Sequence, residues 1–279
     1  MNRNRHRLPS ICVIVFLAFL FCSQLIAGQI DTVVIASQAM NKSPQAVVVL
    51  PDAYKTGKAL PVVYLLHGWS GSYHNWPTKM DLKPLADKYG FIIVCPDGGY
   101  AGWYVNSPIV KDSQYETYIA REVVAFIDKN YRTVADSTGR YLCGLSMGGH
   151  GAITLLAKYP EQYAGAGSMS GAMAMTGRDR RSGLAELLGD YDTNRQLWES
   201  NSSLFLAERL AGRNKAILID CGVDDFLLQT NVAIHKKLLD LKIPHDYFER
   251  PGAHSWGYWT NALEYHLLFF RKNFNKEVK

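Results

Sequence analysis

Cysteine is scarce in this chain of 279 residues, and its five cysteines include no C-x-x-C pair. Two of them lie in an apolar N-terminal stretch, which leaves Cys95, Cys143 and Cys221, each inside a short apolar run. An odd number of cysteines at three strand-like positions does not describe a disulfide framework. Histidines at metal-ligand spacing on one helix are also missing. We therefore expect three buried thiols, and neither a metal nor another cofactor.

An excess of charge of one sign is missing as well. The formal net charge is +5, and three of these charges are Arg3, Arg5 and Arg7, which precede the first acidic residue, Asp31. No dense stripe of lysine and arginine follows, so we expect no nucleic-acid partner. Hydrophobic residues make up 48% of the chain and charged residues 20%, which is typical of a globular protein with a proper core.

Residues 1–28 have the features of an export signal. The three arginines form a positive segment, Ile11–Leu20 is almost wholly apolar, and Ala27 and Gly28 are small enough for cleavage. The apolar run is short for a membrane span. We expect residues 1–28 to be removed as a signal peptide, which predicts a secreted or periplasmic protein without a stable membrane anchor in its mature form.

Residues 29–279 alternate strand and helix patterns without a repeat or a long linker, which predicts a single domain. Val62–Leu66 and Phe91–Cys95 are continuous apolar runs, as in parallel strands buried on both faces. Thr32–Ala39 and Gln45–Leu50 are predicted to form an antiparallel pair at the sheet edge. The other predicted strands are Tyr141–Cys143, Tyr163–Met169, Ala216–Asp220 and His245–Glu249, and the predicted helices are Leu82–Tyr89, Tyr115–Asn130, Gly149–Lys158, Leu227–Leu241 and Trp256–Asn273.

This alternation predicts an α/β fold in three layers, with a mostly parallel, doubly wound sheet and helices on both of its faces. Ligands of such sheets bind beyond the carboxyl ends of the strands. Residues from about 171 to 212 break the alternation, and we expect them to form an insertion over those strand ends.

One G-x-S-x-G motif occurs in the chain, Gly144–Gly148, between a predicted strand and a predicted helix. That setting is typical of a nucleophile elbow, in which the central serine sits on a strained turn. The alternative is a glycine-rich turn that binds phosphate, but it prefers G-x-G-x-x-G or G-x-x-x-x-G-K, and neither is present. Ser146 is therefore the predicted nucleophile.

A serine hydroxyl needs a general base, and in this motif's usual setting the acid and then the histidine follow the serine along the chain. His254 lies in a loop between the last strand and the last helix, where it can reach a strand-end serine. His254 is therefore the predicted base. The other histidines after the motif fall inside helices or begin a strand: His150, His235, His245 and His266.

Three aspartates compete for the role of orienting that base. Asp224 and Asp225 lie in the loop after a predicted strand, whereas Asp220 still lies within the strand. Triad acids occupy strand-end loops, which favours Asp225 and then Asp224. The alternative role of Asp225 is to cap the helix that follows it.

Acyl transfer also needs two N–H donors for the developing oxyanion. One is the N–H of the residue after the nucleophile, Met147, and the other comes from the loop after the third strand. That strand ends in His67-Gly68-Trp69, so the Trp69 N–H is the predicted second donor. His67 is then expected to be structural, as part of the packing of its own loop.

Five motifs follow one another in a single order: LLHGWSGSYHNW, PDGGYAGWY, GLSMGGHGA, CGVDDFLL and PGAHSWGYW. Over about residues 30 to 275 the chain resembles the esterase D / putative esterase family of α/β-hydrolases. That family includes feruloyl and acetylxylan esterases, tributyrin esterase, S-formylglutathione hydrolase and mycolyltransferases. The resemblance implies the α/β-hydrolase fold, Ser146 as nucleophile and His254 as base. It also implies the two oxyanion donors named above, and Asp225 as the acid because it falls three residues after Gly222.

The export signal and the aromatic residues favour a secreted serine carboxylesterase acting on short or aromatic acyl esters of carbohydrate, of the feruloyl or acetyl type. Aromatic rings stack on flat sugar or phenolic groups. Those expected to rim the site are Tyr73, His74, Trp76, Trp103, Tyr104 and Trp256. For any one of them, the alternative is that it only packs loops together.

Two other functions stay open at this point. An S-formylglutathione hydrolase-like thioesterase would use the same groups, but glutathione chemistry is mainly cytosolic and the export signal counts against it. A cell-envelope acyltransferase would form the same acyl-enzyme and pass it to a hydroxyl instead of water.

Overall fold

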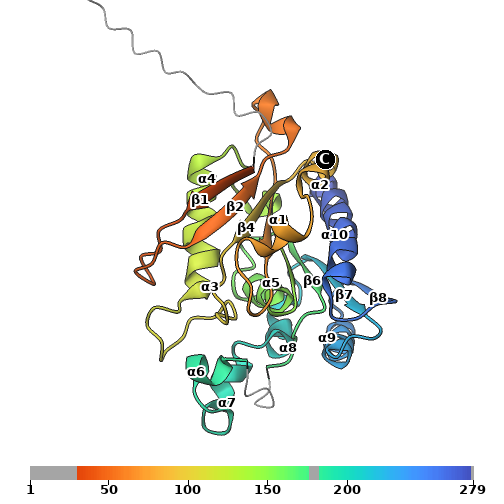
Figure 1. The fold of residues 1–279 in the computed structure, drawn as a ribbon. Helices are drawn as coiled ribbons and strands as arrows, with labels where there is room; N and C mark the ends of the chain where they lie inside the picture. Colours follow the sequence, from red (N-terminus) through yellow and green to blue (C-terminus); the bar gives the residue numbers. More distant parts are fainter. Residues whose placement is uncertain (1–29, 176–181, 278–279) are drawn as a thin grey trace, which may run out of the picture.

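Eight strands form one sheet in residues 30–175 and 182–277, which are the residues described by the computed structural model (Figure 1). The strands are β1 (Ile30–Val34), β2 (Gln45–Val49), β3 (Val62–Leu66), β4 (Ile92–Pro96), β5 (Arg140–Leu145), β6 (Gly165–Met169), β7 (Ala216–Gly222) and β8 (Asp246–Arg250). Their order across the sheet is β1-β2-β4-β3-β5-β6-β7-β8. The pairs β1–β2 and β2–β4 are antiparallel and all the others are parallel. The predicted fold, including the antiparallel pair at the edge, is confirmed.

Helices cover both faces of this sheet (Figure 1). They are α1 (Asn75–Lys79), α2 (Lys83–Tyr89), α3 (Tyr115–Thr117), α4 (Val124–Asn130), α5 (Met147–Lys158), α6 (Leu184–Leu188), α7 (Tyr191–Glu199), α8 (Ser203–Leu206), α9 (Leu228–Asp240) and α10 (Trp256–Glu277). A π-helical turn, η2 (Tyr118–Val123), joins α3 to α4, and short 3-10 turns are η1 (Asp52–Thr56), η3 (Ser137–Gly139) and η4 (Ala207–Leu210). None of the helices in the described ranges has the length and apolar character needed to cross a membrane.

The strands in the middle of the sheet are buried on both faces, as their apolar runs predict. In β3, Val62, Tyr64 and Leu66 pack into one hydrophobic core, whereas Val63 and Leu65 pack into the other. Side chains of a strand alternate between the two faces, so a strand between two helical layers must be apolar at every position. The first core includes residues of α5 and α9, and the second includes residues of α10.

Cys95, Cys143 and Cys221 are free and buried within β4, β5 and β7, which confirms the prediction of three buried thiols. Burial raises the pKa of all three thiols because it disfavours the thiolate. They behave as small hydrophobic side chains.

Several helices and strands near the site begin or end at other residues than predicted. Helix α5 begins at Met147, two residues before the predicted start, and β7 extends to Gly222. A short helix, α1, occupies a segment that was predicted as loop. The predicted insertion contains α6, α7, α8 and η4, while its residues 176–181 lie outside the described residues, as does the predicted export signal at residues 1–28.

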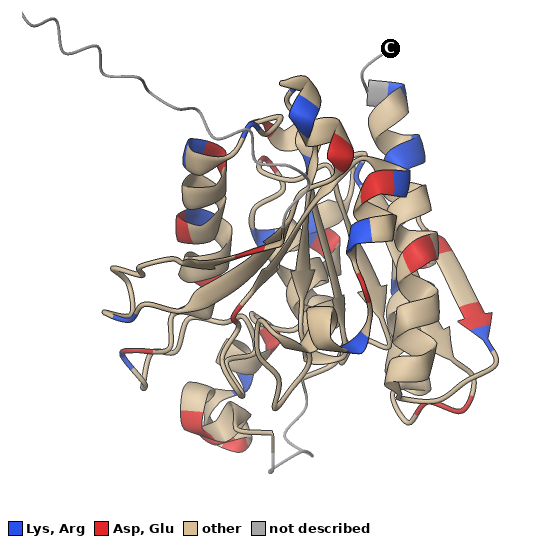
Figure 2. Ribbon diagram, turned by 45° about the horizontal axis from the view of Figure 1, so that its top comes forward, with Lys and Arg blue, Asp and Glu red and all other residues tan. Residues whose placement is uncertain are grey.

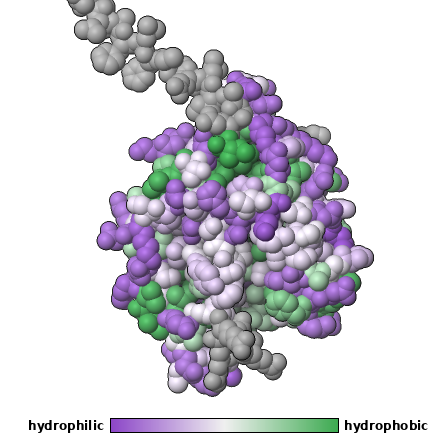
Figure 3. Space-filling view, in the orientation of Figure 1, coloured by the Kyte–Doolittle hydropathy of each residue, from purple (hydrophilic) through white to green (hydrophobic). Residues whose placement is uncertain are grey.

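Charged residues of the described part are spread over helices and loops with both signs interspersed, and the central strands are nearly free of them (Figure 2). On the face shown in Figure 3, hydrophobic residues form separate patches between hydrophilic ones.

The order of the strands determines where a crevice opens at the edge of the sheet. Because β4 and β5 lie on opposite sides of β3, the chain leaves β3 and β5 in different directions, and a crevice opens beyond their carboxyl ends.

Candidate active site

Ser146 occupies the sharp turn between β5 and α5. Its φ of 53° and ψ of −115° lie in a region that residues other than glycine rarely adopt. The Ser146 N–H donates to the Met169 carbonyl at 2.9 Å, which ties the turn to β6. A Cβ atom on Gly148 would lie 2.5 Å from the Leu66 carbonyl oxygen, so only glycine lets α5 pass this close to β3. The strained elbow predicted from the motif is present.

His254 joins this serine to a carboxylate. The Ser146 hydroxyl lies 3.0 Å from His254 Nε2, and His254 Nδ1 lies 2.8 and 3.0 Å from the two carboxylate oxygens of Asp225. A nitrogen that faces a carboxylate carries the proton, so Nδ1–H donates to Asp225 and Nε2 is left to accept from Ser146. The three side chains form one continuous hydrogen-bonded chain.

Asp225 is the aspartate that the structure brings to His254. Its side chain is buried, and the Leu227 N–H also donates to it at 2.8 Å. Burial raises the pKa of the Asp225 carboxyl, but the hydrogen bonds from His254 and Leu227 outweigh that effect, and the pKa lies below its usual value. The carboxylate is therefore ionised at neutral pH.

The two competing aspartates lie elsewhere. Asp224 is exposed on the same loop. Asp220 is fully buried in β7, where its carboxylate accepts from the Tyr258 hydroxyl and, at 2.5 Å, from the Arg250 guanidinium. That carboxylate therefore belongs to a separate buried ion pair.

The other candidate histidines have partners or surroundings of their own. His150 Nε2 donates to the Asn201 carbonyl at 2.7 Å, and His235 and His245 bond each other at 2.8 Å. His266 lies on α10 and is fully buried. His254 is thus the histidine that lies at Ser146.

The two predicted oxyanion donors are free to act. Within the described residues, neither the Trp69 N–H nor the Met147 N–H makes a hydrogen bond. For Met147 the reason is its place as the first residue of α5, because the first N–H groups of a helix have no partner within it. The positive end of the helix dipole lies at the same point, which favours negative charge there.

His67 and Tyr104 hold the loop that carries Trp69. His67 is buried, its Nδ1–H donates to the Gly68 carbonyl at 2.8 Å, and its Nε2 accepts from the Gly98 N–H at 2.8 Å. The Tyr104 hydroxyl donates to the His67 carbonyl at 2.9 Å. Burial lowers the pKa of His67, so the ring stays neutral, as acceptance from Gly98 requires.

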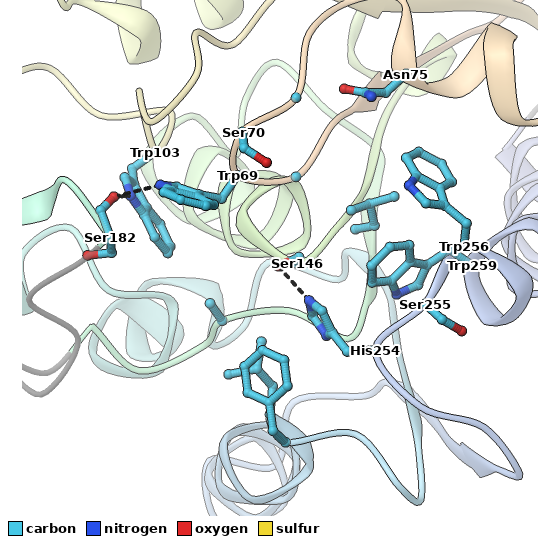
Figure 4. Close-up of a pocket in the computed structure, with 16 residues that line it drawn as sticks. Trp69, Ser70, Asn75, Trp103, Ser146, Ser182, His254, Ser255, Trp256 and Trp259 are labelled. Carbon is cyan, nitrogen blue, oxygen red and sulfur yellow. Dashed lines mark hydrogen bonds between the residues drawn. The ribbon is translucent and has the colours of Figure 1, made fainter.

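A pocket of about 830 Å³ opens at Ser146 and His254 (Figure 4). Aromatic and small residues dominate its walls. The lining residues are Gly68, Trp69, Ser70, Gly71, Asn75, Trp103, Leu145, Ser146, Ala172, Ser182, Phe226, Leu227, His254, Ser255, Trp256 and Trp259.

The predicted rim residues divide into two groups. Trp103 and Trp256 line the pocket, whereas Trp76 and Tyr104 are fully buried and do not. The prediction that Trp76 contacts substrate is therefore corrected: this residue lies on α1, and its indole N–H donates into the core to the Leu66 carbonyl at 3.1 Å. The same correction applies to Tyr104, whose hydroxyl supports the loop after β3.

Tyr73 and His74 are also absent from the lining of this pocket. The Tyr73 hydroxyl donates to the Gln45 side chain at 2.5 Å, and its ring packs beside His74. Tyr73 and His74 therefore pack loops together, and they do not line the pocket.

Sequence reasoning missed several residues that line the pocket. Trp259 follows Trp256 by three residues on α10, and that spacing places both on one side of the helix, so it could have been found. Phe226 directly follows Asp225, and its ring lies 4.5 Å from that of His254. Ser182 offered no such signal, because its contacts to Trp69 and Trp103 depend on tertiary packing.

Comparison with known proteins agrees with this geometry. The family model described as "Putative esterase" matches residues 37–270. The chain belongs to this esterase family. An esterase of Mycobacterium tuberculosis (strain ATCC 25618 / H37Rv) is 33% identical over 247 residues, which cover 78% of this chain and 54% of that protein. The chain thus spans about half the length of this relative.

Two further relatives match over more of their own length. An acetyl esterase of Caldicellulosiruptor saccharolyticus is 27% identical over 226 residues, covering 74% of this chain and 83% of that protein. A solved structure described as a ferulic acid esterase is 29% identical and superposes with a TM-score of 0.77, covering 88% of this chain and 98% of that one. The esterase family of the chain, predicted from its five motifs, is confirmed.

Proposed function

We propose that this protein is a serine carboxylesterase in which Ser146 is the nucleophile, His254 the general base and Asp225 the residue that orients the base. The observation that carries the proposal is the unbroken hydrogen-bonded chain from Ser146 through His254 to Asp225, at 3.0 and 2.8 Å. A serine hydroxyl is a weak nucleophile until a base removes its proton, and a histidine does so only in the tautomer that its acid partner fixes.

In the proposed reaction, Ser146 Oγ attacks the ester carbonyl while His254 Nε2 takes the hydroxyl proton. The carbonyl oxygen becomes an oxyanion that accepts from the N–H groups of Trp69 and Met147. His254 then gives its proton to the departing alcohol oxygen, and the acyl group stays on Ser146. Water repeats the sequence, with His254 as base, and releases the acid.

For the substrate, we propose short or aromatic acyl esters of carbohydrate. Five aromatic residues line or flank the pocket, and aromatic rings favour flat phenolic and sugar groups. The relatives named as acetyl esterase and ferulic acid esterase support the same substrate classes. An exposed aromatic residue, Phe226, stands at the pocket with 76% of its surface accessible, where it can contact a substrate larger than the pocket.

We further propose that the protein acts outside the cytoplasm, because residues 1–28 combine basic, apolar and small-residue segments in the order of an export signal. Sequencing the N-terminus of protein recovered from the culture medium or periplasm tests this. An intact N-terminus on protein that stays in the cytoplasm would overturn it.

A substrate panel tests the esterase function. The protein is expected to hydrolyse 4-nitrophenyl acetate and methyl ferulate, and a fluorophosphonate should abolish both activities by labelling Ser146. Hydrolysis confined to S-formylglutathione would instead favour the thioesterase. Acyl transfer to an added sugar at the expense of hydrolysis would favour the acyltransferase.

A further inference from the structure

Two indole rings beside Ser146 share one hydrogen-bond acceptor. The Ser182 carbonyl accepts from Trp103 Nε1 at 2.8 Å and from Trp69 Nε1 at 3.0 Å, and both tryptophans line the pocket. A carbonyl oxygen has two lone pairs, so one acceptor can fix the orientation of two rings. With their N–H edges turned to Ser182, the rings present hydrocarbon surface to the pocket. We call Trp69 and Trp103 the acyl wall.

The backbone of Trp103 adopts a strained conformation. Its φ of 52° lies in the left-handed region, and only 7% of the residue is exposed. Strain of this kind persists where the surrounding structure requires one geometry, and it gathers at functional sites. The position of the Trp103 ring is therefore a fixed feature of the site.

A second pair of indoles lies on the other side of Ser146 (Figure 4). The Trp259 ring lies 4.8 Å from the His254 ring at 89°, and the Trp256 ring lies 5.5 Å from Trp259 at 84°. Trp256 also packs at 5.2 Å against the buried Trp76. We call Trp256 and Trp259 the leaving-group wall. Trp259 packs against His254 and Trp256 packs against Trp259, whereas both rings of the acyl wall are hydrogen-bonded to Ser182.

The chemistry of the site decides which part of an ester faces which wall. In the tetrahedral intermediate on Ser146, the oxyanion points to the N–H donors of Trp69 and Met147. The leaving oxygen must lie within reach of His254 Nε2, because His254 protonates it. The remaining substituent is the acyl chain, and it points away from His254.

From these constraints we infer that the Trp69–Trp103 wall binds the acyl group, preferring a flat conjugated one, and that the Trp256–Trp259 wall contacts the alcohol. This inference rests on the proposed esterase function. It also gives part of the segment between β6 and β7 a role in specificity, because the Ser182 backbone fixes the acyl wall.

The test is a crossover between two matched substitutions, Trp103→Phe and Trp256→Phe, each of which reduces an indole to a phenyl ring. The acyl ratio is kcat/KM for 4-nitrophenyl cinnamate over that for 4-nitrophenyl acetate, which have the same leaving group. The alcohol ratio is kcat/KM for 1-naphthyl acetate over that for methyl acetate, which have the same acyl group. Intrinsic reactivity cancels when each variant is divided by the unaltered protein.

Trp103→Phe should lower the acyl ratio by about three- to tenfold and change the alcohol ratio by less than about twofold. Trp256→Phe should do the reverse. Thermal unfolding and titration with a fluorophosphonate establish that each variant is folded. Should Trp103→Phe fail to fold, Trp69→Phe replaces it, since Trp69 is 42% exposed and the substitution leaves its backbone N–H in place.

Equal changes of both ratios in both variants, or the opposite pairing of variant and ratio, would overturn the inference while leaving the esterase function standing. A protein that neither hydrolyses 4-nitrophenyl acetate nor reacts with a fluorophosphonate would overturn the proposed function itself, and the inference with it.

Discussion

The proposed catalytic groups of this protein and the walls of the pocket around them are held by different kinds of structure. Ser146, Asp225 and His254 follow β5, β7 and β8, and these strands run parallel in one sheet. The carboxyl ends of parallel strands meet at one edge, so the sheet itself delivers all three groups to one place. The pocket walls come instead from the loop after β3, the loop after β4, the segment after β6 and the start of α10.

The elbow and the acyl wall differ in how far apart along the chain the residues that fix them lie. The elbow around Ser146 depends on glycines within two residues of it. The acyl wall depends on Ser182, which is 79 residues from Trp103 and 113 from Trp69 along the chain. A wall of this kind can change in evolution without disturbing the sheet, since loops tolerate substitution better than the strands they connect.

The largest effect is expected at Ser146, the proposed nucleophile. Ser146→Ala should lower kcat by about 10⁴- to 10⁶-fold while leaving the wall region and the fold intact. Steady-state hydrolysis of 4-nitrophenyl acetate and thermal unfolding measure the two parts of this expectation. Activity above about a hundredth of the unaltered rate, in protein free of contaminating esterase, would show that Ser146 is not the nucleophile.

The next largest effect is expected at the proposed acid, where the neighbouring residues Asp225 and Asp224 should differ strongly in their effect on kcat. Asp225→Asn should lower kcat by about 10⁴-fold with little change in KM, since an amide at this place holds His254 in the wrong tautomer. Asp224→Asn is the matched control and should cost about tenfold or less, because that side chain is exposed and lies outside the hydrogen-bonded chain. A severe loss in Asp224→Asn with an active Asp225→Asn would reverse the assignment.

The fold and the close approach of Ser146, His254 and Asp225 can be predicted from the sequence because both depend on short patterns. A continuous apolar run predicts a strand buried on both faces, and β3 alternates between two cores as that interpretation requires. The spacing within Gly144–Gly148 implies the elbow, and a loop histidine after the last strand can reach it. His254 and Asp225 lie where these rules place them.

The same reasoning failed for side chains whose direction depends on tertiary packing. Trp76 was expected in a loop at the rim of the site, yet it lies on α1 and its indole is buried in the core. Tyr104 neighbours a residue that does line the pocket, but its own ring is buried and its hydroxyl donates to the His67 carbonyl. Both residues adopt positive φ, 52° for Trp103 and 57° for Tyr104. No pattern in a single sequence predicts such a pair of angles.

Acid is expected to destabilise the protein through two buried histidines, His150 and His266. His150 lies on α5, the helix that follows the elbow, and donates to the Asn201 carbonyl. Burial lowers the pKa of His150 to about 4 and that of His266 to about 3. The unfolded chain has histidine pKa values near 6.5, so below pH 6.5 it binds more protons than the folded protein. The stabilisation from the neutral rings is complete above that pH and is lost as the pH falls toward 4.

Each of these two histidines should lower the free energy of unfolding by about 1.4 kcal/mol per pH unit in that window, or about 2 kcal/mol at pH 5. Urea unfolding between pH 7 and 4.5 measures the slope. His150→Gln keeps a donor for Asn201 but cannot titrate, and His266→Leu removes a ring without a hydrogen-bond partner among the described residues. Slopes as steep in both variants as in the unaltered protein would contradict the expectation.

The smallest effect is expected at Tyr104, whose hydroxyl supports the loop that carries the proposed oxyanion donor Trp69. Tyr104→Phe removes the hydroxyl that donates to the His67 carbonyl at 2.9 Å, two residues before the Trp69 N–H. We expect a loss of about 1 kcal/mol in unfolding free energy and a several-fold fall in kcat, with KM little changed.

The matched control is Tyr118→Phe, because Tyr118 is equally buried and its hydroxyl has no partner within residues 30–175 and 182–277. Removing an unpaired buried hydroxyl should leave the rate unchanged and stability equal or higher. If Tyr118→Phe lowers kcat as much as Tyr104→Phe does, the effect is one of general packing, and the loop after β3 owes nothing specific to the Tyr104 hydroxyl.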